Sequence, residues 1–291
     1  MTKKVKKLNS LSKGRPPTFK ANRRLSSKAT RKIIQNHHNL QKERTKALAN
    51  GDSAKASILM EQIESQGGIE GYQMASLLGQ SSERGGDSSK LLLEWLKPVT
   101  TELRQGVVNR KPHRFLEIGA LSHFNACTTC NLFEIERIDL NSQVNTIKKQ
   151  DFMLMPIPHD EKDKFDIISL SLVLNFVPDA AEKGNMLLRT VKFLKHPKYS
   201  GSDEYVRLFP CLFLVLPASC VMNSRYMDNT RLTEIMRSLG YICVKYKLTK
   251  KLIYYLWRLE HTGPPLTNIQ KFRKQEVRSG KSRNNFTILL N

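Results

Sequence analysis

Two short stretches decide the fold of this chain: residues 115–119, which read Phe-Leu-Glu-Ile-Gly, and residues 137–139, which read Arg-Ile-Asp. Each has the length and apolar character of the end of a buried strand. Gly119 and Asp139 stand 20 residues apart. In a doubly wound sheet this spacing brings a glycine at one strand tip beside a carboxylate at the next. Backbone can then approach a nucleoside while the acid accepts hydrogen bonds from its ribose, so we predict a nucleoside site here.

Apolar runs and helical periodicity alternate on both sides of these stretches. The pattern predicts helices over residues 29–65 (broken near 50–52), 72–78, 88–98, 180–194 and 230–239, and strands over 115–118, 132–138, 165–176, 211–216, 241–246 and 252–257. Alternating strands and helices indicate an α/β fold with a mostly parallel sheet that is covered on both faces. The last two strands follow each other directly, which favours an antiparallel pair. Only 13 residues separate Gly119 from Phe133, so the first crossover helix must be short or missing.

Charge is concentrated at the two ends of the chain. The formal net charge is +22, of which residues 1–46 contribute +14, residues 263–291 contribute +5 and the middle only +3. Basic ends on a nearly neutral body indicate a polyanionic partner, because contacts to phosphates release counterions. A nucleic acid is the leading expectation, and a membrane surface or a solvated tail are the alternatives. Residues 1–35 contain few large apolar side chains, so we expect them to be disordered until they meet a partner.

Other signals in the sequence predict little chemistry. The five cysteines are an odd number without a secretory signal, which favours reduced thiols in an intracellular protein. Cys127 and Cys130 form one pair without a second pair at zinc-site spacing, so no metal site is expected. The apolar stretch 208–222 contains two prolines and is too short to span a bilayer, so no membrane partner is expected. His37 and His38 lie in a basic helical region and are expected at the surface.

Three further residues near the predicted strand ends are candidates for ligand contacts. Asp151 and Phe152 fall where the loop after a third strand would lie, so that the carboxylate can bind an adenine amino group and the ring can pack on the base. Glu117, in the strand that ends at Gly119, either anchors the ligand's amino or carboxylate end or is a polar residue facing a helix.

These motifs follow one another in the order of class I methyltransferases, which the chain resembles from about residue 114 to residue 257. More narrowly, three stretches are similar to the fungal 25S ribosomal RNA adenine-N(1) methyltransferase family. They are residues 116–121 (Leu-Glu-Ile-Gly-Ala-Leu), 138–141 (Ile-Asp-Leu-Asn) and 169–178 (Ser-Leu-Ser-Leu-Val-Leu-Asn-Phe-Val-Pro). The resemblance implies a Rossmann-like methyltransferase with a seven-stranded sheet that binds S-adenosyl-L-methionine at Gly119 and Asp139. It also implies methylation of adenine N(1) in large-subunit ribosomal RNA during ribosome biogenesis, in the nucleus and nucleolus.

Two departures from the class pattern bear on function. Only one glycine stands in the loop after the first strand, and the first crossover helix must be short or missing. The short connection disfavours a dinucleotide, whose pyrophosphate needs a helix N-terminus there. Where amino-methylating enzymes often carry Asn or Asp, two prolines and an aromatic residue, this chain has Asn175-Phe176-Val177-Pro178. Asn175 and Phe176 either bind and stack on a flipped adenine or simply close the strand.

The sequence thus predicts four regions: a basic tail over 1–35, a helical region over 36–110, the S-adenosylmethionine-binding domain over 111–262 and a basic C-terminal tail over 263–291. The substrate is expected to be ribosomal RNA, either free or in a pre-ribosomal particle. Two other functions fit the same fold. One is a non-catalytic S-adenosylmethionine sensor, as animal relatives of the family are described to be, and the other is an RNA-binding assembly factor. The sequence sets no oligomeric state.

Overall fold

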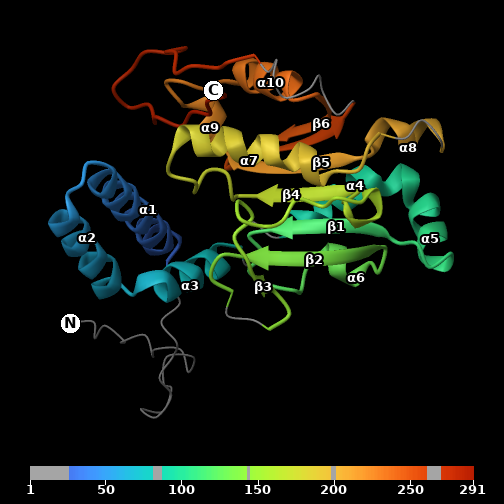
Figure 1. Ribbon diagram of the computed structural model, residues 1–291, viewed down its shortest axis with the longest axis horizontal. Helices are drawn as coiled ribbons and strands as arrows, with labels where there is room; N and C mark the ends of the chain where they lie inside the picture. Colours follow the sequence, from blue (N-terminus) through green and yellow to red (C-terminus); the bar gives the residue numbers. More distant parts are fainter. Residues whose placement is uncertain (1–25, 81–86, 143–144, 198–200, 261–269) are drawn as a thin grey trace, which may run out of the picture.

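A seven-stranded sheet forms the centre of the protein, as the computed structural model in Figure 1 shows. The structure describes residues 26–80, 87–142, 145–197, 201–260 and 270–291. Its strands are β1 (His113–Ile118), β2 (Phe133–Asp139), β3 (Lys148–Lys149), β4 (Ile167–Ser171), β5 (Cys211–Pro217), β6 (Tyr241–Leu248) and β7 (Leu252–Leu259). Their order is β3-β2-β1-β4-β5-β7-β6; β7 pairs antiparallel with both β5 and β6, and the other described pairs are parallel. The predicted mostly parallel sheet and its antiparallel final pair are both confirmed.

Helices cover both faces of the sheet because the central strands are apolar on both sides. In β5, Leu212 and Leu214 belong to one core layer while Phe213 and Val215 belong to the other, as the two-residue period of a strand requires. The first layer is completed by α7 (Ala180–Phe193), α9 (Ala218–Met222) and α10 (Asn229–Ser238), and the second by α4 (Ser89–Leu96), α5 (Thr100–Val108), α6 (Ala126–Thr129) and α8 (Asp203–Leu208). Two single 3-10 turns, η2 (Lys97–Val99) and η3 (Glu161–Asp163), join these elements.

Strand β4 is much shorter than the predicted strand over residues 165–176, and this prediction was wrong at its C-terminal end. Leu172 has a φ of 59°, a left-handed conformation that turns the chain out of the sheet. Its N–H still donates to the carbonyl of Val215 at 2.9 Å. The apolar run continues to Leu174 because this side chain is fully buried and its apolar neighbours in the loop are half-buried. Residues 172–178 therefore form a packed loop at the carboxyl edge of the sheet.

The connection between β1 and β2 is reduced to the one-turn helix α6, which confirms the predicted loss of a full crossover helix. Asn125 caps this turn, because its side-chain oxygen accepts the N–H of Thr128 at 3.0 Å.

Three helices precede the sheet domain: α1 (Ser27–Ala49), α2 (Ser53–Ser65) and α3 (Gly68–Gln80). In Figure 1 they lie beyond the arrowheads of β1, β2 and β4. The chain breaks between α1 and α2 at Asn50–Asp52, as predicted. Ser26 caps α1 by accepting the N–H of Ala29 at 3.1 Å, so the helix begins inside the region predicted to be a tail. Residues 1–25 of that predicted tail lie outside the described residues.

The described part of the predicted C-terminal tail, residues 270–291, packs on the sheet domain. Phe272, Ile288 and Leu290 are buried in the core layer of α7. Gly184 of α7 permits this contact, since a Cβ there would lie 1.8 Å from the carbonyl oxygen of Leu289. Among the described residues, no helix is both long and apolar enough to cross a membrane.

Candidate active site

A cavity of about 680 Å³ opens at the carboxyl edge of the sheet, between the strand tips and helices α1 and α3. Ligands of doubly wound sheets bind at this edge. Six of the seven candidate residues from the sequence line the cavity: Gly119, Asp139, Asp151, Phe152, Asn175 and Phe176. The structure therefore brings together residues from four separate segments of the chain.

Gly119 and Asp139 are neighbours, as their spacing predicted. Ile118 pairs with Ile138 in the parallel register of β1 and β2, and the N–H of Gly119 donates to the carbonyl of Ile138 at 2.8 Å. Gly119 has a φ of 74°, and a Cβ there would lie 2.5 Å from Cγ2 of Val173. A glycine is therefore required both by the backbone conformation and by the close approach of the loop after β4.

The two acids of the cavity are held by backbone donors. Asp139 Oδ1 accepts the N–H of Asn141 at 2.9 Å, and Asp151 Oδ1 accepts the N–H of Met153 at 2.7 Å. The carbonyl of Asp139 also accepts the N–H of Gln150 at 2.9 Å, which ties the loops after β2 and β3 together. Both carboxylates are thus oriented before any ligand arrives.

Phe152 lines the cavity but belongs mainly to the core. It is 2% exposed, and its ring lies 5.0 Å from that of Phe193. Arg189 of α7 donates to the carbonyl of Phe152 at 2.7 Å and stacks its guanidinium near the same ring. The ring therefore anchors the loop after β3 as well as closing the cavity.

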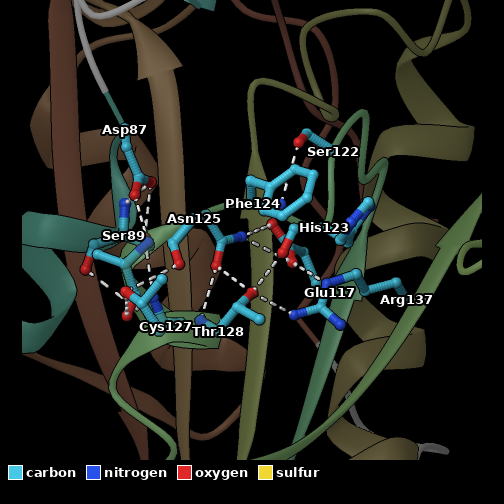
Figure 2. Close-up of polar contacts among 12 residues, drawn as sticks. Asp87, Ser89, Glu117, Ser122, His123, Phe124, Asn125, Cys127, Thr128 and Arg137 are labelled. Carbon is cyan, nitrogen blue, oxygen red and sulfur yellow. Dashed lines mark hydrogen bonds and ion pairs between the residues drawn. The ribbon is translucent and has the colours of Figure 1, made fainter.

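Glu117 does not line the cavity, and the structure places it beneath the loop that follows β1, as Figure 2 shows. Its carboxylate accepts two hydrogen bonds from Nδ2 of Asn125, at 2.9 and 3.1 Å, and pairs with Nε of Arg137 at 3.2 Å. Arg137 lies directly opposite Glu117 in the register of β1 and β2. Burial raises the pKa of Glu117 against the opposing pull of Arg137.

The same polar network extends to the helix on the other side of the loop. Asp87 accepts hydrogen bonds from the N–H groups of Ser89 (2.9 Å) and Ala126 (2.5 Å), and Arg137 donates to the hydroxyl of Thr128 at 2.6 Å (Figure 2). These side chains hold the loop between Gly119 and α6 in place. In a standard dinucleotide site, additional glycines and a long helix shape the corresponding loop.

Asn175 and Phe176 project from the loop after β4 into the cavity. The Oδ1 atom of Asn175 is buried and has no hydrogen-bond partner within the described part of the chain. A buried acceptor without a donor is costly, so this atom marks a position where a ligand donor belongs. Phe176 lies edge-on to Tyr72 of α3, with ring centroids 5.8 Å apart.

Helices α1 and α3 contribute cavity residues that the sequence analysis missed. His37 is 9% exposed and stacks on Tyr72, with centroids 4.8 Å apart and planes at 18°, so its expected surface position was wrong. Burial lowers the pKa of His37. A signal was present, because four cavity residues form one stripe of α1 at helical spacing: Thr30, Ile34, His37 and Gln41.

The cavity fits an S-adenosylmethionine molecule in size and chemistry. Its volume lies within the range of pockets for such ligands. Gly119 leaves room for close backbone approach, and the carboxylates of Asp139 and Asp151, predicted to bind the ribose and the adenine amino group, line the same cavity. No phosphate has to be accommodated at the one-turn helix α6.

The fold and the cavity together define a Rossmann-like methyltransferase that uses S-adenosylmethionine. Comparison with known sequences identifies the family within this class. The chain belongs to the family described as 25S rRNA (adenine(2142)-N(1))-methyltransferase, Bmt2, whose sequence model matches residues 57–288.

Two relatives are similar over most of the chain. The 25S rRNA adenine-N(1) methyltransferase of Schizosaccharomyces pombe is 39% identical over 257 residues, covering 88% of this chain and 90% of that protein. The 25S rRNA (adenine(2142)-N(1))-methyltransferase of Saccharomyces cerevisiae is 41% identical over 258 residues, covering 87% and 70%. Among solved structures, the N-methyltransferase NodS of Bradyrhizobium japonicum with S-adenosyl-L-homocysteine matches at 13% identity and a TM-score of 0.34, covering 57% of this chain and 87% of NodS.

Proposed function

We propose that this protein transfers a methyl group from S-adenosylmethionine to N1 of an adenine in large-subunit ribosomal RNA. The observation that carries the proposal is the buried Oδ1 of Asn175, which has no hydrogen-bond partner among the described residues and lies in the cavity that Gly119 and Asp139 line. The family and both relatives are named for this reaction.

An unpaired acceptor at this position suits adenine better than guanine. Adenine carries its amino group on C6, next to N1, and this group can donate to Asn175 Oδ1, whereas a guanine held in the same orientation has a carbonyl oxygen at C6. A site that leaves its buried acceptor unpaired rejects the wrong base strongly, by the loss of a whole hydrogen bond. The selected base must leave its stack to reach the cavity, where Phe176 and the Tyr72–His37 stack supply aromatic surface.

The residues of this chain position the target base and do not act as a general acid or base. When bound, S-adenosylmethionine supplies the activated methyl group. Adenine N1 carries its own lone pair at neutral pH and needs no general base. The cavity walls align the base and exclude water, which is the main source of rate enhancement for such a transfer. Methylation leaves the base cationic, so the carbonyl dipole of Asn175 also stabilises the developing charge.

The basic ends of the chain support binding to RNA in a nucleolar, pre-ribosomal setting. Residues 1–46 carry 15 basic side chains against the single acid Glu43. Such segments bind phosphates without reading sequence, while the pocket selects the base. We therefore propose the nucleus and nucleolus as the location, and free or particle-bound large-subunit RNA as the partner.

The proposal is tested by incubating the protein with labelled S-adenosylmethionine and an unmodified large-subunit RNA transcript, followed by mapping of the modified base. We expect label as 1-methyladenine at one position. Asn175→Ala should lower kcat on the order of 10²-fold, as the loss of one charge-stabilising group does, with little change in cofactor affinity. Asn185→Ala, which removes an exposed amide from α7, is the matched control and should retain full activity.

Tight binding of S-adenosylmethionine without any transfer to RNA would instead support the sensor function. Absence of cofactor binding would favour an RNA-binding assembly factor.

A further inference from the structure

A basic hairpin borders the mouth of the active-site cavity. The end of β6 and the turn into β7, residues 245–251, read Lys-Tyr-Lys-Leu-Thr-Lys-Lys, with four lysines and no acid. All seven residues are exposed. We refer to this segment as the β6–β7 ridge.

The ridge continues the cavity wall. Strand β5 ends at the carboxyl edge with Pro217, which pairs with Leu252 at the start of β7. Pro217, Lys251 and Leu252 all line the cavity. Because β7 runs antiparallel to β5, the turn before it projects from the same edge of the sheet as Gly119 and Asp139. The ridge therefore lies beside the cavity, at the same edge of the sheet.

The turn of the ridge is held firmly in place. Thr249 donates its N–H to the carbonyl of Leu252 at 2.8 Å, and its hydroxyl oxygen accepts the N–H of Leu252 at 3.0 Å. The carbonyl of Lys251 accepts the N–H of Ala218 at 2.8 Å, which fastens the turn to the start of α9. A fixed turn loses little conformational entropy when it binds a ligand.

The exposed side chains offer both kinds of contact that RNA uses. Across the described ranges, Lys245, Lys247 and Lys250 have no carboxylate within 4.0 Å, so salt bridges do not neutralise them. Tyr246 is 51% exposed, and its ring is supported by Tyr255 at 5.6 Å between centroids. Lysines bind phosphates, and an exposed aromatic ring on a firm support can stack on an unpaired base.

We propose that the β6–β7 ridge binds the RNA strand that flanks the target adenine and guides it into the cavity. This inference rests on the proposed function, since it concerns the same RNA. Lysines on an edge strand also discourage unwanted pairing between sheets. That role alone predicts no effect of the ridge on RNA binding, so the two explanations can be separated.

The test compares two double variants that each remove two positive charges. Lys247→Gln/Lys250→Gln neutralises the ridge. Lys97→Gln/Lys111→Gln neutralises exposed lysines at the opposite, amino edge, where Lys111 lies two residues before the start of β1. Binding of an unmodified large-subunit RNA transcript is measured between about 0.05 and about 0.3 M salt, together with methyl-transfer kinetics and the Kd for S-adenosylhomocysteine.

We expect the ridge variant to bind the transcript roughly tenfold more weakly at about 0.15 M salt, and its salt slope to fall by about 1.5, because two phosphate contacts are lost. KM for the transcript should rise by a similar factor, while kcat and the Kd for S-adenosylhomocysteine stay unchanged. The amino-edge variant should match the wild type.

Two outcomes would overturn the inference while leaving the proposed function intact. One is a ridge variant that binds the transcript as tightly as the wild type. The other is an amino-edge variant that is weakened as much as the ridge variant, since the effect would then follow net charge alone. If the wild type neither binds nor methylates the transcript, the proposed function fails first.

Discussion

Substituting alanine for Gly119 tests whether the strand tip and the loop after β4 are fitted to each other. The introduced alanine would have to keep a φ of 74°, which costs an L-residue about 1 kcal/mol. Its Cβ would lie 2.5 Å from Cγ2 of Val173, so the valine must move by about 1 Å to reach normal contact. Overpacking of this kind costs roughly 1–3 kcal/mol. We expect Gly119→Ala to lower the free energy of unfolding by about 2–4 kcal/mol in total.

The steric part can be separated from the backbone part with a second substitution. Val173→Ala removes the atom that the new methyl group would strike, so the double variant should recover the overpacking cost and retain only the backbone strain. The coupling free energy between the two sites should therefore be roughly 1–3 kcal/mol. It is measured by urea unfolding of the wild type, both single variants and the double variant.

Cofactor binding provides an independent measure of the same fit. Val173 lies two residues before Asn175, and a shift of its side chain moves the loop across the cavity. Titration calorimetry with S-adenosylhomocysteine should show weaker binding for Gly119→Ala and partial recovery for the double variant. A coupling near zero, or a Gly119→Ala protein with wild-type stability and affinity, would show that this close approach does not exist in solution.

Three further substitutions address other parts of the structure. Asp139→Ala removes the predicted ribose acceptor and should raise the Kd for S-adenosylhomocysteine roughly 10- to 100-fold, the cost of a hydrogen bond to a charged group; calorimetry showing unchanged affinity would mean that the ribose binds elsewhere. Burial lowers the pKa of Lys183 to about 8, so the folded protein releases this proton between about pH 8 and 10.5 while the unfolded chain retains it. The wild type should therefore gain up to about 3 kcal/mol of stability relative to Lys183→Met across that range, and a constant difference in unfolding free energy from about pH 7 to about pH 10 would contradict the shift. Ile288→Ala opens a cavity beside α7 and should cost about 2–5 kcal/mol by denaturant unfolding, whereas a loss below about 0.5 kcal/mol would show that the C-terminal segment is not packed there.

The sequence predicted those features that follow from the spacing of consecutive strands and from the length of their connections. Gly119 and Asp139 are found together because strand register is regular, so a spacing of 20 residues translates directly into proximity. The short connection after Gly119 followed from its length alone. The end of β4 was missed because a buried loop and a buried strand share the same apolar composition, and only the φ of Leu172 separates them.

Features that depend on contacts between distant segments were not predicted, although the stripe of α1 that contains His37 was visible in the sequence. The contribution of His37 requires knowing that α1 packs over the strand tips, and the ridge requires the pairing of Pro217 with Leu252. Glu117 was a candidate by position, and it stands 20 residues before Arg137, the same spacing as Gly119 and Asp139. The regular strand register could therefore have predicted this ion pair as well.

The polar network that holds the loop between Gly119 and α6 determines which mutations that loop can tolerate. A loop shaped by several glycines is damaged wherever atoms are added. In this loop, Gly119 is sensitive to added atoms. The rest of the loop is held in shape by the hydrogen bonds and the ion pair of Glu117, Asn125 and Arg137, so it is destabilised when those side chains are truncated. In a saturation screen of residues 117–128, bulky replacements should therefore be depleted at Gly119, and alanine should be depleted at Glu117 and Asn125.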